Sequence, residues 1–496
     1  MQLSKTKYCR AVQCKKMLWL DLYKPEEAEE VSDASVLENG TEVGELAKGI
    51  FGEYSDVPFS KDLRQMISKT KELLLNENIV ITEASFEFEN LFCSVDILRK
   101  TKNQIELYEV KSSTEVREIY IQDISYQYYL LKKLGYSVIK ASIVFVNPFY
   151  ERKGDLDLQK LFVIQDVTSI VEENRRQVEE NIKKIEEYVK RGEIEDSIDM
   201  HCFKPYPCPY FSYCTKHLEK NNIFELRRMP KKKLIDFYKE GVTSFEQLVD
   251  RNIKEPYKKQ ILYALEEKPP CVDVGKIKIF LSSLYEPLYF LDFETFQEAI
   301  PKYNNTRPYM QIPFQYSLHY IENGKLKHKE FLGEPTTDPR RALALQLVED
   351  IPQNACVVAY NMMFEKMIIK HLSVLYPDLR EHLVHIYENM HDLMIPFKEG
   401  YYYTKAMQGS YSIKYVLPAL FPNEKELDYH HLDMVHNGKE AMNLFKELAN
   451  KEEQERKCIR ESLLAYCKLD TYAMVKIWFK LNELVNIEKK ETMEVP

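Results

Sequence analysis

Apolar and polar residues follow two different periods in the N-terminal part of the chain. Residues 85–100 and 104–113 alternate apolar and polar positions, which predicts two strands joined by a short polar turn. Apolar residues in 172–192 are spaced four, three and four positions apart, which predicts a charged amphipathic helix. Other patterns predict helices over 1–30, 40–51 and 119–135, and a strand over 137–148. Together these elements predict an α/β domain over residues 1–215.

A second α/β pattern begins near residue 284. Its predicted strands are 288–294, 313–321 and 356–360, and its predicted helices are 339–350, 363–372 and 460–484. Between the two patterns the chain is helical, basic at RRMPKKK, and closed by the two prolines of EEKPP. The sequence therefore predicts three domains: 1–215, a helical connector over 216–283, and 284–496.

Composition narrows the class of protein. A net charge of −9 excludes a broadly basic coat for nucleic acid, so such contacts must come from local basic patches or bound cations. No run reaches the roughly 20 apolar residues of a membrane helix, and the N-terminus lacks the apolar core of a signal peptide. We therefore expect a cytoplasmic protein that does not enter membranes. Its ten cysteines then favour buried thiols or metal ligands over disulfides.

The first set of candidate residues surrounds the stretch YEVKSS. Glu109 and Lys111 are two positions apart on a predicted strand, so they share one face. Asp96 lies on the preceding strand of the same hairpin, and Glu45 lies on an upstream helix. Three carboxylates around one point form an oxygen-ligand site for Mg²⁺ or Mn²⁺. Lys111 beside them can orient an attacking water and offset charge. The alternative is a solvated strand face with alternating charges.

A cysteine-rich loop ends the first domain. Cys202, Cys208 and Cys214 are spaced C-x5-C-x5-C, and the prolines between them enforce a tight extended loop. Clustered thiolates suit a soft metal or an iron–sulfur cluster. Cys14 is the best candidate for a fourth ligand, and Cys9 is its rival. The alternative is that these cysteines are buried free thiols, which is the expectation for the other cysteines.

Two carboxylates interrupt the apolar run YFLDFETF. Asp292 and Glu294 point to the same side of the predicted strand, where burial is costly unless a cation compensates them. Glu365 enters a downstream helix, and Tyr466 and Asp470 are four apart on one face of the last helix. Four acids suit two-metal hydrolysis of a phosphodiester, with Tyr466 holding or helping to deprotonate the attacking water. The alternative is a strand end whose acids face solvent.

The ordered set E…D…ExK…Q resembles the PD-(D/E)XK nuclease superfamily, and most closely its RecB-like branch, which contains the CRISPR adaptation nucleases. The resemblance implies that Glu45, Asp96 and Glu109 bind metal, and that Lys111 is catalytic. It also implies that Gln127 helps to position the motif or the substrate. Some relatives carry a metal-binding His near the first acid, and this chain has no His there.

Nucleases of this branch hold a [4Fe–4S] cluster with one N-terminal and three C-terminal cysteines, a layout that this chain shares. The resemblance therefore implies a structural iron–sulfur cluster on Cys14, Cys202, Cys208 and Cys214, in preference to Zn²⁺. The spacing alone does not choose between the two.

The later set, D-x-E, then E, then Y-x3-D, resembles the DnaQ-like 3′→5′ exonucleases of the RNase H-like fold. The typical second motif ends in Asp, and here Glu365 stands in its place with a longer reach. The stretches MHDLMIPF and GSYSIKYVLPAL are also similar to this group. They make Asp392 a possible additional acid near the site and GSYSIK a possible substrate contact.

The connector carries a basic run. Its members are Arg227, Arg228, Lys231, Lys232 and Lys233. With two short predicted helices around Gly241, the segment distantly resembles a helix-hairpin-helix element, which holds phosphates without reading sequence. A solvated charged face is the other interpretation, and the one that such runs favour in general.

The whole chain resembles a family of bacterial and phage proteins that fuse an iron–sulfur RecB-like nuclease domain to a DnaQ-like exonuclease domain. The resemblance implies a metal-dependent nuclease with two hydrolytic sites. Its expected substrate is DNA, single-stranded or with free ends, in repair, recombination or phage defence. An RNA exonuclease, or a nucleic-acid-binding or assembly protein with one inactive site, is the alternative.

Overall fold

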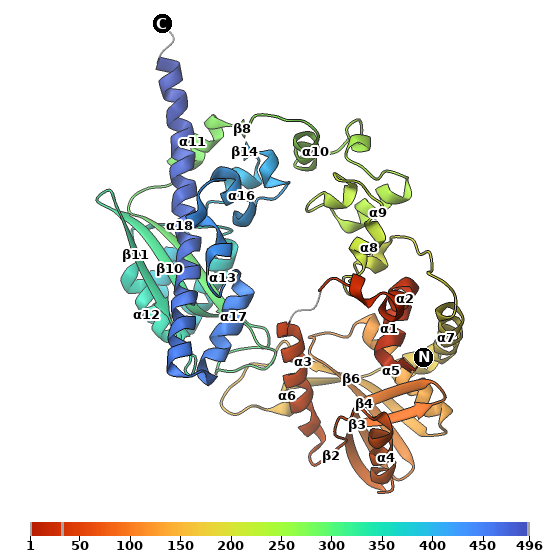
Figure 1. The fold of residues 1–496 in the computed structure, drawn as a ribbon. Helices are drawn as coiled ribbons and strands as arrows, with labels where there is room; N and C mark the ends of the chain where they lie inside the picture. Colours follow the sequence, from red (N-terminus) through yellow and green to blue (C-terminus); the bar gives the residue numbers. More distant parts are fainter. Residues whose placement is uncertain (1, 31–33, 494–496) are drawn as a thin grey trace. The chain divides into compact units, whose positions relative to one another are not determined.

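The protein forms two compact units of mixed α/β structure (Figure 1). The computed structural model describes residues 2–30 and 34–493. Unit 1 comprises Met1–Glu219, Lys231–Lys239 and Glu298–Met310, and unit 2 comprises Lys220–Pro230, Glu240–Gln297 and Gln311–Pro496. The predicted connector is thus divided, because its segment 231–239 belongs to unit 1 and most of the remainder belongs to unit 2.

Unit 1 is built on a seven-stranded sheet in the order β2-β3-β4-β5-β6-β7, with β1 paired to β4. Its strands are β1 (Leu3–Ser4), β2 (Ser55–Asp56), β3 (Asn78–Phe88), β4 (Leu91–Thr101), β5 (Gln104–Lys111), β6 (Ser137–Val146) and β7 (Phe162–Asp166). Strand β4 is antiparallel to both β3 and β5, whereas β6 runs parallel to β5. The helix between β5 and β6 is therefore a crossover that packs on the sheet.

The helices of unit 1 lie around this sheet. They are α1 (Lys5–Gln13), α2 (Lys15–Tyr23), α3 (Ala34–Ala47), α4 (Leu63–Leu73), α5 (Glu118–Lys133), α6 (Leu158–Leu161), α7 (Thr168–Val189), α8 (Phe211–Thr215) and α9 (Lys231–Lys239). Helices α5 and α7 confirm their predictions closely. Two predictions are wrong. The helix expected over 1–30 breaks at Cys14, which adopts an extended backbone, and the strand expected over 85–100 contains a turn at Glu89, whose φ is 54°.

Unit 2 is built on a five-stranded sheet in the order β11-β10-β9-β12-β13. Its strands are β9 (Leu288–Phe296), β10 (Ile312–Glu322), β11 (Lys325–Leu332), β12 (Cys356–Ala359) and β13 (Met390–Asp392), and a separate pair consists of β8 (Cys271–Val272) and β14 (Tyr402–Tyr403). Strand β9 is central, antiparallel to β10 and parallel to β12. The predicted strands β9, β10 and β12 are confirmed, whereas β11 and β13 were not expected.

The helices of unit 2 are α10 (Tyr257–Leu265), α11 (Val274–Ser282), α12 (Arg340–Asp350), α13 (Met363–Leu375), α14 (Arg380–Glu388), α15 (Ile395–Lys398), α16 (Ile413–Leu420), α17 (Gly438–Glu447) and α18 (Glu453–Met493). The predicted helices α12, α13 and α18 are confirmed, with α18 longer than expected. Figure 1 shows α18 as a long helix that runs alongside the sheet. Among the described residues, no helix combines the length and the apolar character that crossing a membrane requires.

The period of two along β9 divides its side chains between two environments. Leu291 and Phe293 face the apolar core formed with helices α12, α13 and α14. Phe290 points to the opposite face, where its ring centroid lies 6.1 Å from that of Trp478 on α18. Asp292 and Glu294 share that second face. The two carboxylates are therefore placed beneath α18 by the alternation of the strand itself.

Candidate functional site

Three predicted acids of unit 2 converge beneath α18. The carboxylate oxygens of Asp292, Glu294 and Asp470 all lie within 4.8 Å of one another. Strand β9 supplies the first two, and α18 supplies the third. Glu294 is buried, and Asp292 and Asp470 are half-buried. The arrangement concentrates three negative charges in a space that water reaches poorly.

The fourth predicted acid, Glu365, lies close to the same point. It is in the first turn of α13, 3% exposed, and its Oε2 atom is buried without a hydrogen-bond partner. A carboxylate oxygen in that condition is costly unless a cation or a proton satisfies it. The electrostatic influence of Glu365 on Asp292 and Glu294 shows that it belongs to the same group.

Burial and mutual repulsion dominate the titration of these acids. Burial, together with the neighbouring carboxylates, raises the pKa of Asp292 and of Glu294 well above the ordinary range. Burial and then Asp392 raise the pKa of Glu365 to about 8. Burial raises the pKa of Asp470 to about 6, although the Tyr429 hydroxyl and Lys414 act in the opposite direction. Each of these shifts marks a carboxylate that lacks sufficient positive charge nearby.

Three more side chains complete this site. The Tyr429 hydroxyl donates to Asp470 Oδ1 at 2.6 Å, and the Cys467 thiol lies 3.7 Å from Asp292 Oδ2. Lys414 belongs to the stretch GSYSIK, which the sequence indicated as a possible substrate contact, and its charge lowers the pKa values of Glu294 and Asp470. No pattern in the sequence distinguishes Tyr429 or Cys467, because only the fold brings them to the acids.

Gly438 approaches Glu294 closely. A Cβ atom at this first residue of α17 would lie 3.2 Å from Glu294 Oε2. The N-terminal end of α17, with its partial positive charge, therefore faces the carboxylate without an intervening side chain. This contact also has no signal in the sequence.

The structure also places Tyr466 and Asp392, two residues that the sequence analysis named, near the acids. Tyr466 is 4% exposed, and its hydroxyl hydrogen bond lowers the pKa of Asp470. Asp392 Oδ1 accepts hydrogen bonds from the backbone N–H groups of Asn361 and Met394, at 2.9 and 3.0 Å. Asp392 thus fastens the start of α13 and lies next to Glu365, which makes it a positioning residue for that acid.

The donor set of unit 2 fits hard divalent cations. Four carboxylates supply only oxygen ligands, the type that Mg²⁺ and Mn²⁺ prefer. Among residues 2–30, 40–429 and 431–486, no lysine or arginine forms an ion pair with any of the four. The unsatisfied Glu365 Oε2 points to the same conclusion. Bound cations would supply the missing positive charge and hold these acids ionised at neutral pH.

The candidate residues of unit 1 are compensated in a different way. Lys5 Nζ lies 3.2 Å from Asp96 Oδ1 and 3.0 Å from Glu109 Oε1. Lys111 Nζ lies 2.6 Å from Glu109 Oε1 and 2.7 Å from Asp123 Oδ2. Two lysines thus already neutralise the acids of this site. The structure brings Asp96, Glu109 and Lys111 together as predicted, and it adds Lys5 and Asp123.

Gln127 joins this network from α5. Its Nε2 atom donates to Glu109 Oε2 at 2.6 Å and to Asp123 Oδ1 at 3.1 Å. Burial and the neighbouring Asp96 raise the pKa of Glu109, but Lys111 and Lys5 outweigh them and leave it below the ordinary value. Glu109 is therefore ionised without a metal. The donor set is chemically suited to a cation, but in this arrangement Lys5 occupies the carboxylate oxygens that would bind it.

Glu45 is not part of the network that Lys5 and Lys111 form with Asp96, Glu109 and Asp123. Its side chain is 63% exposed and pairs with Lys48 at 2.8 Å, while Lys48 also pairs with Asp56 at 3.0 Å. A carboxylate that sequence analysis missed, Glu83, lies nearer to the group. It has a φ of 56° within β3, and burial followed by Asp96 raises its pKa to about 7. A non-glycine residue in the left-handed region carries backbone strain of the kind that is found at functional sites.

The four predicted cluster cysteines gather in unit 1. Cys14 lies at the break between α1 and α2, Cys202 and Cys208 precede α8, and Cys214 lies within α8. Cys14 and Cys208 share one apolar cluster, against which Cys214 packs. The rival ligand, Cys9, packs instead against the main core of unit 1. The structure thus favours Cys14 as the fourth member of the group.

The thiol group also has polar neighbours that the sequence did not indicate. Ligand atoms of Cys14, Asp196 and His201 all lie within 4.8 Å of one another. Burial raises the pKa of Cys14 to about 12 and that of Cys202 to about 11, so the free thiols keep their protons at neutral pH. A metal that binds here must displace those protons. The residues fit a thiolate-bound metal, and the O and N donors beside them are compatible with Zn²⁺ as well as with an iron–sulfur cluster.

The predicted basic run is divided between the two units. Arg227 donates to the Tyr415 hydroxyl at 2.6 Å, and the Arg228 guanidinium lies 3.2 Å from the ring centroid of Tyr411, all within unit 2. Lys231, Lys232 and Lys233 belong to unit 1, at the start of α9, and are exposed. Lys231 lies 5.0 Å from the Phe203 ring, and Lys233 lies 5.6 Å from the Phe237 ring.

Comparison with protein-family models gives a match over residues 289–412 to a domain of unknown function, DUF2779. The matched segment contains β9 with its two acids, the start of α13 with Glu365, and Asp392. A search of curated proteins finds no match to the chain.

We predict that divalent cations stabilise unit 2 in a pH-dependent way. Raised pKa values of Asp470 and Glu365 stabilise the cation-free protein below about pH 4, and this contribution is lost as the pH rises to about 8. Cations compete with protons for the same oxygens. Saturating Mn²⁺ should therefore raise Tm by about 5–10 °C near pH 8 and by much less near pH 5. The measurement is thermal unfolding of wild type, Asp292→Asn and the exposed control Asp433→Asn. An equal Mn²⁺ effect in Asp292→Asn would contradict the assignment.

We predict that Lys5 takes the place of a cation in unit 1. In an Asp292→Asn background, Lys5→Ala should lower the free energy of unfolding by about 3 kcal/mol, because it leaves buried Glu109 short of positive charge. Mn²⁺ should restore most of that loss. Urea unfolding with and without Mn²⁺ measures both quantities, and Lys7→Ala is the matched control. If Mn²⁺ stabilises the Lys5→Ala and Lys7→Ala variants by the same amount, Lys5 is a structural residue only.

We predict that the four cysteines carry a metal centre. Protein purified without oxygen should contain iron and sulfide and show broad visible absorption, and Cys208→Ser should lose both and unfold at a lower temperature. Exposed Cys458 provides the control substitution, Cys458→Ser. Zinc in place of iron would assign a Zn²⁺ site, and the absence of both metals would mean that the thiols are free.

Proposed function

We propose that this chain is a metal-dependent nuclease and that unit 2 hydrolyses phosphodiester bonds at Asp292, Glu294, Glu365 and Asp470. The observation that carries the proposal is the gathering of four buried or half-buried carboxylates without a lysine or arginine ion pair among the described residues. Like charges gathered in this way need protons or cations, and hydrolysis of phosphodiesters is the chemistry that oxygen-bound cations serve best.

The residues of the site have separable roles in this proposal. The four carboxylates hold Mg²⁺ or Mn²⁺, which activates water and stabilises the leaving oxygen when bound. Tyr429 donates to one oxygen of Asp470 and so fixes the orientation of that carboxylate. Tyr466, buried beside Asp470, is placed to position the attacking water. Lys414 supplies positive charge close to Glu294 and Asp470, where it would also attract a phosphate.

The order of elements supports the resemblance to DnaQ-like exonucleases. The D-x-E pair is on the central strand β9, Glu365 begins α13, and Tyr466 and Asp470 are one turn apart on α18. In unit 1, the β3–β5 antiparallel strands, the crossover α5 and the parallel β6 support the resemblance to PD-(D/E)XK nucleases. We assign the primary hydrolytic site to unit 2, because Lys5 already neutralises the acids of unit 1. Unit 1 becomes a second site if Lys5 withdraws.

The proposed substrate is DNA that is single-stranded or has free ends. The site lies in a chain of net charge −9, so cations and a few local basic residues must attract the polymer. An RNA substrate is the alternative within the same chemistry. A nucleic-acid-binding or assembly role is the alternative outside it.

We predict that Asp292→Asn and Asp470→Asn lower cleavage by about 100-fold or more, because loss of cation binding forfeits several kcal/mol of transition-state stabilisation. The measurement uses end-labelled single- and double-stranded DNA and matched RNA, with Mn²⁺ or with chelator. Asp433→Asn is the control in unit 2, and Lys111→Ala tests unit 1. The polymer that is cut distinguishes DNA from RNA on the same gel.

The outcomes separate the alternatives. If Lys111→Ala abolishes cleavage and Asp292→Asn does not, the active site is in unit 1. If the protein binds nucleic acid but neither polymer is cut under any condition, the binding or assembly role is correct. If product patterns change differently in the two variants, both units hydrolyse.

A further inference from the structure

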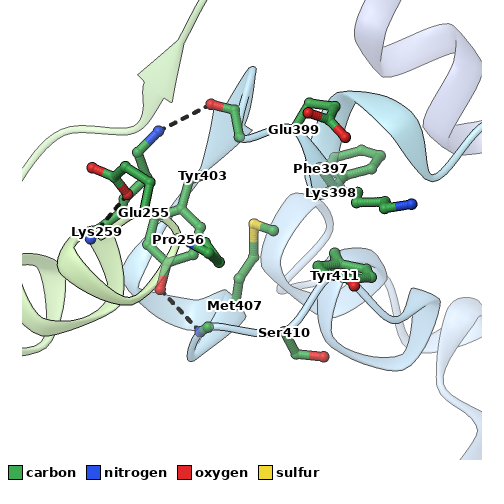
Figure 2. A pocket seen from close by; sticks show the side chains of 12 residues that line it. Glu255, Pro256, Lys259, Phe397, Lys398, Glu399, Tyr403, Met407, Ser410 and Tyr411 are labelled. Atoms are coloured by element: carbon green, nitrogen blue, oxygen red, sulfur yellow. Dashed lines mark hydrogen bonds between the residues drawn. The ribbon is translucent and has the colours of Figure 1, made fainter. Parts of the chain in front are cut away.

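A small cavity of about 220 Å³ opens in unit 2 (Figure 2). Phe397 and Tyr411 lie on one side of it, and Pro256 and Tyr403 lie on the other, with Met407 between them. Phe397, Tyr403 and Met407 are buried, whereas Tyr411 is half-buried and Pro256 is exposed. The deep wall is therefore apolar and largely aromatic, and the cavity opens to solvent at its rim.

The rim of the cavity carries no net charge. Glu255 and Glu399 offset Lys259 and Lys398, and Lys259 Nζ already donates to the carbonyl of Gly400 at 3.0 Å. This balance does not suit an anion such as a phosphate. The volume lies below the roughly 300–1,000 Å³ of sites that hold complete small molecules. A single neutral, planar ring with polar edges fits both the size and the charge.

The loop that forms one wall of this cavity continues into the acidic site. The backbone carbonyl of Tyr411 accepts a hydrogen bond from the Tyr360 hydroxyl at 2.7 Å. Tyr360 lies beside Asp392, the residue that fastens α13 next to Glu365. Lys414, three residues after Tyr411, lies close enough to Glu294 and Asp470 for its charge to lower the pKa of both. The short segment 411–414 therefore connects the cavity with the carboxylates.

Two arginine side chains stack on tyrosine rings at or near the aromatic wall. The Arg228 guanidinium lies 3.2 Å from the Tyr411 ring centroid. Arg228 does not line the cavity, so it stacks on a side of the ring that is not part of the cavity wall. Arg227 stacks on Tyr415 at 4.2 Å from the ring centroid. Phosphates next to a ring in the cavity would therefore meet positive charge, although the cavity lining itself has no net charge.

Gln260 holds this arrangement in place. Its Oε1 atom accepts from the backbone N–H of Arg227 at 3.1 Å, and its Nε2 atom donates to the carbonyl of Glu225 at 2.9 Å. Gly409 passes so close that a Cβ atom there would lie 2.2 Å from Gln260 Oε1, and its φ of 75° also favours glycine. The arginines and the aromatic loop are therefore fixed against the same side chain.

We propose that this cavity holds one unstacked base of a single-stranded nucleic acid whose backbone passes Arg228 and Lys414 to reach the four carboxylates. The inference rests on the proposed function and specifies its substrate as a strand with an exposed base. An aromatic wall accepts any base by stacking, and the apolar floor excludes the phosphate. A paired base is stacked within a duplex and cannot enter without being extruded.

The test measures binding of fluorescently labelled single-stranded DNA to the full chain carrying Asp292→Asn, by fluorescence anisotropy with Mn²⁺. A series of oligonucleotides lacks the base at one successive position each. We expect one position where loss of the base weakens Kd by about 5-fold or more. Adding Tyr411→Ala should weaken binding of the intact strand by the same factor. For the strand that lacks the base at that position, Tyr411→Ala should cause no further loss. Tyr411→Phe should retain full affinity.

Two controls separate stacking from a general defect. Phe479→Ala removes an exposed aromatic residue elsewhere in unit 2 and should leave Kd unchanged. Tyr411→Leu keeps apolar volume but loses the ring, so it should behave like Tyr411→Ala, and equal Tm values show that the variants are folded. If no position depends on Tyr411 while wild type still cleaves and Asp292→Asn does not, the base pocket is wrong and the proposed function stands. If wild type neither binds nor cuts single strands, both are wrong.

Discussion

Unit 2 depends on the burial of like charges at one point. Asp292, Glu294, Glu365 and Asp470 are held together by a strand and two helices. Burial raises all four pKa values, and repulsion from other carboxylates adds to the shift of Asp292, Glu294 and Glu365. Such a group is stable only when protons or cations occupy it. The N-terminus of α17 and Lys414 bring some positive charge, and Tyr429 donates a hydrogen bond to Asp470, but these contacts do not return the pKa values to the ordinary range.

In unit 1, lysine side chains of the protein itself compensate the negative charge of the clustered acids. Lys5 and Lys111 hold Glu109 ionised, and Gln127 donates a hydrogen bond to it. These contacts compensate the buried Glu109 carboxylate without a metal. The two units therefore represent two states that acidic sites can adopt. In unit 1 the lysines of the protein compensate the acids, and in unit 2 we propose that cations from solution do so.

Much of both candidate sites could be predicted from local pattern. The period of two placed Asp292 and Glu294 on one face, and the spacing of four placed Tyr466 beside Asp470. The same reasoning paired Glu109 with Lys111. It assigned Glu45 to the first site, where the structure pairs that residue with Lys48, and it did not identify Glu83. Glu83 comes near Asp96 because β3 pairs with β4, and no local pattern shows that pairing.

The sequence by itself determined which residues share a face, because helix and strand periods are properties of the local backbone. It also determined the order of the elements that carry the acids. Only the tertiary structure decided which charges compensate them. Lys5 reaches Glu109 across 104 positions of the chain, and Tyr429 reaches Asp470 across 41. Contacts of that range follow from how strands pair and helices pack, so the balance of charge at each site is a property of the folded chain.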